Sequence, residues 1–134
     1  MYDQLVTLLH RQATALEAVE SRLRALELLV VADEERFLVQ AMEDLEQAAE
    51  RLAALELGRT LVLATAGLPV DASATELAGA VDPDTHALFT DVVVRLRTAT
   101  NGVADARARA AAVLGAAAED VRQRLAAAEA AVIV

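Results

Sequence analysis

The stretch from Leu5 to Val30, LVTLLHRQATALEAVESRLRALELLV, decides the fold of this chain. Its apolar residues recur at alternating spacings of four and three, the period of a helix that buries one stripe in coiled-coil-like packing. This seam consists of Leu5, Leu9, Gln12, Leu16, Val19, Leu23, Leu26 and Val30, and Gln12 is its one polar member. We therefore predict a helix from about Asp3 to Val31.

The pattern breaks after Val31 and resumes in a different register. We predict that Asp33 caps the start of a second helix, with Glu34 and Glu35 in its first turn, where the helix dipole favours carboxylates. One continuous helix through Asp33 is the alternative. The second seam consists of Leu38, Ala41, Leu45, Ala48, Leu52, Leu55 and Val62, and Arg59 interrupts it.

The second helix is predicted to run to about Ala66. Gly67 follows as a C-terminal cap and Pro69 as a stop. Two helices of similar length joined by a short turn bury their apolar stripes most simply against each other. Residues 1–66 are therefore predicted to form an antiparallel helical hairpin.

Residues 67–82 are predicted to be a linker that contains one short helix. Ser73 and Glu76 have the spacing of a capping box, and the helix that they start is expected to end near Gly79. The pair Asp82-Pro83 is a second start signal, with Asp at the N-cap and Pro at the first helical position.

A long C-terminal helix is predicted over residues 83–134. Asn101-Gly102 interrupts its stripe, and we favour one long, bent helix over two helices with a turn there, because a lone interior Gly costs only ~1 kcal/mol relative to Ala. The stripe is bulky before Asn101 and mostly Ala after Gly102. It runs through Leu88 or Phe89, Val92, Leu96, Ala99, Val103, Ala106, Ala110, Val113, Ala117, Val121, Leu125 and Ala128.

Composition supports an all-α class. Hydrophobic residues make up 56% of the 134 residues but aromatic residues only 2%, whereas strands favour aromatic and β-branched side chains. The hydrophobic content also excludes a disordered acidic tail. We predict a single elongated helical domain over residues 1–134, organised as a coiled-coil-like bundle.

The net charge of −9 bears on the class of partner. It disfavours nucleic acid, whose phosphates are bound mainly by Lys and Arg, and it disfavours anionic membrane surfaces. No apolar stretch reaches the ~18 residues of a membrane-spanning helix, and the start of the chain lacks the basic region of a secretion signal. A cytoplasmic location is expected, and the absence of Cys suits a reducing compartment.

The residues that usually carry chemistry are sparse. Neither His10 nor His86 has a Glu three positions before it, so the di-metal bundle motif is missing, and both are expected to be solvated side chains. Ser73 is a cap, and Ser21 lies within a helix. No phosphate loop, dinucleotide fingerprint or nucleophile elbow occurs. We expect no catalytic residues, no metal and no cofactor, and therefore a protein that is not an enzyme.

Surplus amphipathic helix is the feature that points to function. The chain has more apolar stripe than one hairpin can cover, which favours self-association or a partner helix in a groove. The alternative is that the last helix packs only on its own hairpin. The expected partner-binding residues lie on the apolar face of that helix and are Val113, Leu114, Ala117, Val121 and Leu125.

The order of these segments resembles the FlgN-type flagellar export chaperones across essentially the whole chain. The first helix ends in Leu-Glu-Leu-Leu-Val-Val-Ala-Asp at residues 26–33, and a Gly-Leu-Pro linker at residues 67–69 precedes a short capped helix and a long helix with Asn101 at its middle. The second helix contributes Glu46, Leu52, Leu55, Glu56 and Arg59. The family's last helix often has a second Asn a few residues away, whereas Ala104 and Asp105 follow here.

The resemblance implies a small, acidic, helical, cytoplasmic chaperone without cofactor. It would hold the C-terminal helical segment of the hook–filament junction proteins before type III export, with the export apparatus as a further partner. Two other classes stay open at this point. One is a structural coiled-coil module that acts by homo-oligomerisation, and the other is a ligand-binding or regulatory helical bundle.

Overall fold

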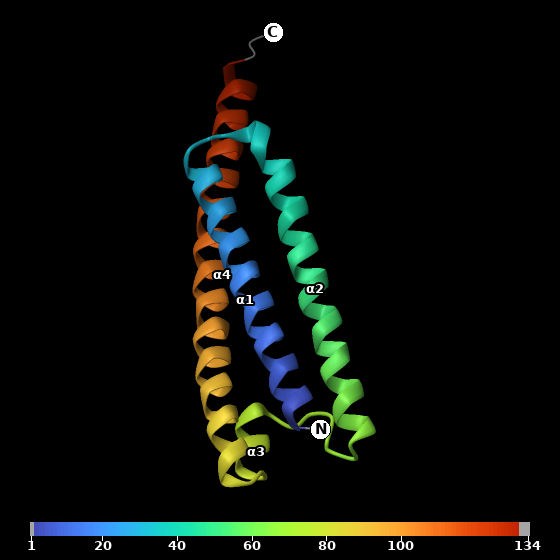
Figure 1. Cartoon of the computed structure of the whole chain (residues 1–134). Coiled ribbons are helices and arrows are strands. Elements are labelled where there is room, and N and C mark those ends of the chain that lie inside the picture. Colours follow the sequence, from blue (N-terminus) through green and yellow to red (C-terminus); the bar gives the residue numbers. More distant parts are fainter. Residues whose placement is uncertain (1, 132–134) are drawn as a thin grey trace.

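Helix α1, Tyr2–Val31, lies at the centre of the computed structural model, which describes residues 2–131 (Figure 1). It is followed by α2, Leu38–Thr65, the short α3, Ala74–Gly79, and the long α4, Pro83–Ala131. The all-α class, the antiparallel hairpin, the short helix and the long last helix are thus confirmed. Residue 1 and residues 132–134, which belong to the predicted hairpin and last helix, lie outside the described residues.

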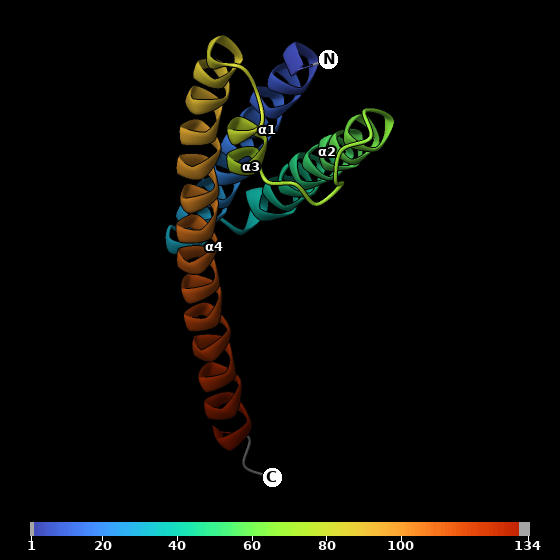
Figure 2. The same ribbon diagram turned by 90° about the horizontal axis from the view of Figure 1, so that it is seen from below.

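The two predicted seams are the surfaces that pack. Every member of the α1 seam and of the α2 seam is buried or partly buried. α1 contacts α4 more extensively than it contacts α2. The α1 seam therefore packs against α4 as well as against α2, its neighbour in the hairpin. The long helices α2 and α4 therefore flank α1, and Figure 2 shows them diverging toward the α3 end.

Two apolar clusters hold the three long helices together. The proximal cluster, near α3, has Leu9, Leu63 and Phe89 completely buried, and the ring of Tyr2 meets that of Phe89 edge-on at 6.0 Å. The central cluster is built from smaller residues, which let the helices approach closely. Its buried members are Val19, Leu23, Ala48, Ala106 and Ala110.

The turn between α1 and α2 differs from the prediction. Asp33 is not an N-cap: its φ of 56° places it in the left-handed region, as the second residue of the turn, Ala32 and Asp33, that follows α1. The Glu34 N–H donates to the Leu29 carbonyl at 3.0 Å and the Asp33 N–H to the Val30 carbonyl at 3.2 Å, the bond pair of a Schellman motif. Asp tolerates this conformation better than most residues, so it terminates the first helix instead of starting the second.

The second helix accordingly begins later than predicted. A 3₁₀ helix, Glu35–Phe37, comes first, and α2 starts at Leu38. Glu34 and Glu35 therefore do not lie in the first turn of α2, and that prediction was wrong.

The other boundary signals behave as predicted. Gly67, with φ 72°, closes α2 through a second Schellman motif, and Ser73 and Glu76 form both hydrogen bonds of a capping box. α4 starts at Pro83 and continues as one helix through Gly102. A Cβ at Gly102 would meet the carboxylate of Glu20, the far end of a flexible side chain that would have to shift.

Gly58 within α2 and Gly67 in the turn after it give a matched stability test. A Cβ at Gly58 would meet only Leu8 Cδ1, at 3.9 Å, so Gly58→Ala should raise the free energy of unfolding by ~0.5–1 kcal/mol through helix propensity. Gly67→Ala should lower it by ~1 kcal/mol, because an L-residue is strained at positive φ. Urea unfolding followed by circular dichroism measures both; two changes of the same sign would contradict the assigned helix end.

Candidate partner-binding site

The distal half of α4 extends past the other helices. α4 has 49 residues and α1 has 30, so about 19 residues, or roughly 28 Å of helix, cannot lie beside α1 in any register. Figure 2 shows this part of α4 running alone beyond the α1–α2 turn. Residues 118–130 are all exposed.

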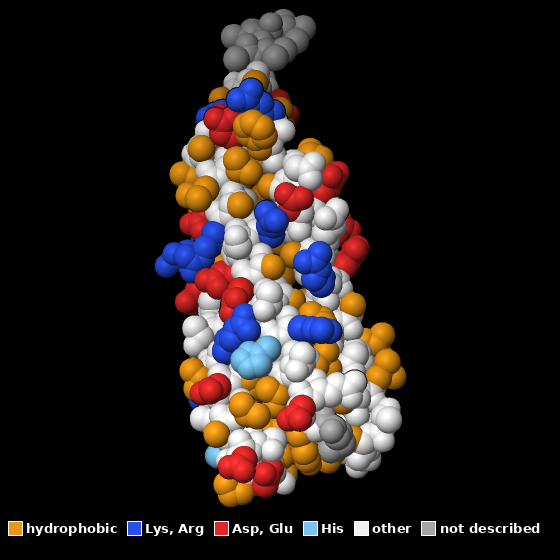
Figure 3. Space-filling view, viewed as in Figure 1, with side chains coloured by type: hydrophobic (Ala, Val, Ile, Leu, Met, Phe, Trp, Pro, Cys, Tyr) orange, Lys and Arg blue, Asp and Glu red, His pale blue; other side chains and the backbone are white. Residues whose placement is uncertain are grey.

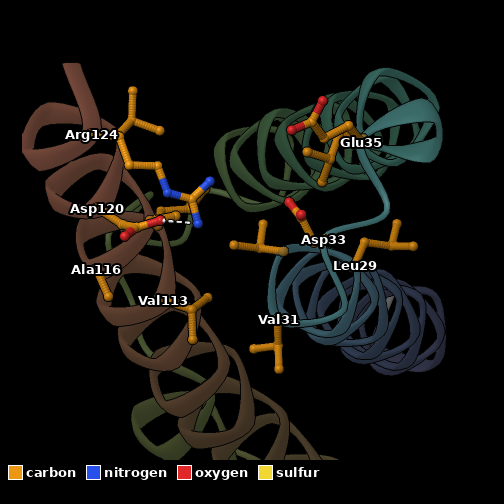
Figure 4. Close-up of a pocket in the computed structure, with 13 residues that line it drawn as sticks. Leu29, Val31, Asp33, Glu35, Val113, Ala116, Asp120 and Arg124 are labelled. Carbon is orange, nitrogen blue, oxygen red and sulfur yellow. Dashed lines mark ion pairs between the residues drawn. The ribbon is translucent and has the colours of Figure 1, made fainter. Parts of the chain in front are cut away.

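A cleft of about 520 Å³ opens where α4 passes the α1–α2 turn (Figure 4). We call it the distal cleft. One wall comes from α4 and the other from the end of α1, the turn and the start of α2. The apolar lining consists of Leu29, Val30, Val31, Leu38, Val113, Leu114, Ala116, Ala117 and Val121. Figure 3 shows hydrophobic side chains gathered at this level, with charged side chains around them.

The rim of the distal cleft is mostly acidic. Asp33, Glu35 and Asp120 carry carboxylates into its lining, against the single guanidinium of Arg124. Arg124 Nη2 lies 2.9 Å from Asp120 Oδ2, and both side chains are more than half exposed. Such an exposed pair is screened by water and contributes little to stability. Three carboxylates against one guanidinium leave the rim with a net negative charge.

The structure brings together four of the five predicted partner-binding residues. Val113, Leu114, Ala117 and Val121 all line the distal cleft. Leu125 lies one turn beyond them, outside the lining and 58% exposed. Leu114 and Val121 are 44% and 61% exposed, so this face is not buried against the chain's own hairpin.

The opposite wall was missed from the sequence. Of Leu29, Val30 and Val31, only Val30 belongs to the predicted seam, and the other two were assigned no role. Val31 is nevertheless 68% exposed and faces α4 across the cleft (Figure 4). The signal that could have found them is the apolar run from Leu28 to Val31, which is wider than one helix seam requires.

A second, polar cleft of about 450 Å³ lies near α3, and we call it the proximal cleft. Gln12 is the polar member of the α1 seam, and Arg59 is the residue that interrupts the α2 seam. The two are hydrogen-bonded: Arg59 Nη1 donates to Gln12 Oε1 at 3.4 Å. Arg59 Nη2 also donates to the Ala72 carbonyl at 2.7 Å. Burial lowers the pKa of Arg59, while the nearby Glu56 carboxylate acts in the opposite direction.

On the other side of α1, Arg95 fastens α4 to α1. Its Nε and Nη2 donate to the two Glu17 carboxylate oxygens at 3.0 and 3.1 Å, and Nη2 also donates to Thr14 Oγ1 at 2.8 Å. Its Nη1 donates to the His10 carbonyl and to His10 Nδ1, both at 3.2 Å. All five N–H groups of the guanidinium are thus used, which fixes the register of the two helices.

Of the two histidines, His10 is less solvated than predicted, whereas His86 is exposed, as expected. His10 is partly buried, and its Nδ1 lies 3.2 Å from Arg95 Nη1. The Nδ1 of His86 lies 2.6 Å from the Ala78 carbonyl and joins α4 to α3. Single histidines on a helix carry no sequence signal for such partners, because the partners come from other helices.

Within residues 2–131, no three His, Asp or Glu side chains are grouped so that they could hold a metal ion. None of the helices in this range combines the length and apolarity needed to cross a bilayer. No protein-family model matches the chain, and no curated protein or solved structure is significantly similar to it. The arrangement itself, an apolar cleft with an acidic rim, therefore carries the functional argument.

The distal half of α4 should be the least protected long element of the free protein. The side chains of residues 118–130 are exposed, and few apolar contacts resist local unfolding there. Amide hydrogen exchange measured by NMR should give protection that falls from Ala110 toward Leu125. Protection around Leu125 equal to that of residues 45–55 in α2 would contradict this expectation.

Proposed function

We propose that this protein is a non-catalytic, helix-binding chaperone that holds an amphipathic segment of a partner protein in the distal cleft. One observation carries the proposal: Leu114 and Val121 face an open cleft and are 44% and 61% exposed in the monomer. An apolar stripe that its own chain leaves uncovered is the surface that helix-in-groove recognition uses, with anchors spaced by three, four and seven residues.

The cargo proposed from the FlgN-type resemblance is the C-terminal helical segment of a hook–filament junction protein, held in the cytoplasm before flagellar type III export. The small residues Ala116 and Ala117 support this class of cargo, because they let a second helix approach the α4 backbone closely. The export apparatus is the further partner that this role requires. No cofactor, nucleic acid or membrane insertion takes part.

The test uses synthetic peptides that comprise the C-terminal segments of the hook–filament junction proteins encoded in the same genome. Binding is measured by isothermal titration calorimetry with the wild-type protein and with a Val121→Asp/Leu125→Asp double variant. Because an exposed residue contributes little to the fold, the variant should melt within a few degrees of the wild type. A carboxylate placed in an apolar contact should weaken binding at least tenfold, on the order of 1.4 kcal/mol.

Val94→Asp is the matched control, since Val94 is also 58% exposed and lies on α4 outside both clefts. It should bind the peptide like the wild type. A large drop in melting temperature for the double variant would show that this face serves the chain's own fold. A concentration-dependent dimer that the double variant abolishes, with no peptide binding, would favour the homo-oligomeric coiled-coil module instead.

A further inference from the structure

The surface between α2 and α4 carries opposite charge at its two ends. The distal cleft has the carboxylates of Asp33, Glu35 and Asp120, with Arg124 paired to Asp120. The proximal cleft has two arginines and one carboxylate, and it is lined by residues of all four helices. A ligand that spans both clefts therefore meets negative charge at one end and positive charge at the other.

The two arginines of the proximal cleft are Arg59 and Arg97. Among residues 2–131, neither guanidinium lies within 4.0 Å of a carboxylate oxygen. Arg59 is partly buried, and within the part of the chain that the structure describes its donors meet only two acceptors, both uncharged: the Gln12 side chain and the Ala72 carbonyl. A guanidinium has five donors in a planar fork, so most of those of Arg59 stay available to an incoming carboxylate.

Partly buried apolar residues lie along α2 and α4 between the two clefts. Leu45 and Leu52 of α2 and Val103 of α4 are only partly buried, and they pack on the central cluster. Along α4, Arg97 and Val121 are 24 residues apart, which corresponds to about 36 Å of helix. An amphipathic helix of about 24 residues therefore reaches from one cleft to the other.

We infer that the bound helix lies between α2 and α4 in one direction, with its N-terminus at the α1–α2 turn and its C-terminal carboxylate between Arg59 and Arg97. This inference rests on the proposed function and adds the orientation of the partner to it. The physical basis is charge complementarity. The N-terminal end of a helix carries a partial positive charge and favours carboxylates, whereas the C-terminal end is negative and favours guanidinium groups.

The chain-terminal carboxylate is the strongest partner for the Arg pair. It adds a full charge to the partial charge of the helix end, and Arg recognises carboxylates through two parallel hydrogen bonds. In this orientation the guest helix runs parallel to α2 and antiparallel to α4. The reverse orientation would place its negative end against Asp33, Glu35 and Asp120.

The experiment compares two forms of one junction-protein peptide, with a free C-terminal carboxylate and with a C-terminal amide. Titration calorimetry measures both against the wild type, Arg97→Gln and the control Arg107→Gln, whose residue is exposed on α4 and outside both clefts. The amide should bind the wild type and Arg107→Gln about tenfold more weakly than the free acid does, the order expected for losing one charge-assisted pair. With Arg97→Gln the difference between the two peptides should shrink to about twofold or less.

Arg59→Gln is a second variant that probes the same pair from α2, and its melting curve shows whether loss of the Ala72 contact disturbs the fold. Equal affinity of the two peptides for the wild type would overturn the orientation while leaving the proposed function standing. Failure of both peptides to bind would overturn both. An acid–amide difference that persists in Arg97→Gln and in a folded Arg59→Gln would place the carboxylate elsewhere and contradict the inference.

Discussion

The structure depends on the packing of α1 against two neighbours at once. α1 is the one described helix that contacts both other long helices extensively, so its apolar seam must serve α2 on one side and α4 on the other. Polar contacts then fix the register that apolar packing alone leaves loose. Arg59 of α2 donates a hydrogen bond to Gln12 of α1. Arg95 of α4 donates all five of its N–H groups to acceptors on α1.

The position of the candidate site follows from helix lengths. With α1 and α2 at 30 and 28 residues and α4 at 49, the end of α4 extends beyond any internal partner. Its side chains match this position, since Ala dominates and Leu114, Val121 and Leu125 stay exposed. The added length thus contributes little to the fold and supplies most of the cleft wall.

Much of this fold could be predicted from the sequence, because its signals are local. The periods of the apolar seams located the long helices. Gly67 marked the end of α2, and Ser73 marked the start of α3. The continuous apolar stripe predicted that α4 runs through Gly102. Asp33 was misread, since Asp serves both as an N-cap and as a left-handed terminator, and the choice between these depends on how the chain turns back. The α4 wall of the distal cleft was also predicted. The facing wall, Leu29 to Val31, and the Arg59–Gln12 contact could not be, because both depend on how separate helices lie in space.

The central claim is that the face of α4 beside the α1–α2 turn is kept open for a helix from another protein. Intermolecular methyl NOEs test it most directly, in a complex of Leu- and Val-labelled protein with an unlabelled junction-protein peptide. The account predicts NOEs from Leu114, Val121, Val31 and Leu45 to the peptide, and none from Leu57 or Val94, which are exposed outside both clefts. NOEs confined to Leu57 and Val94, or a bound peptide that leaves the Leu114 and Val121 methyls unchanged, would contradict it.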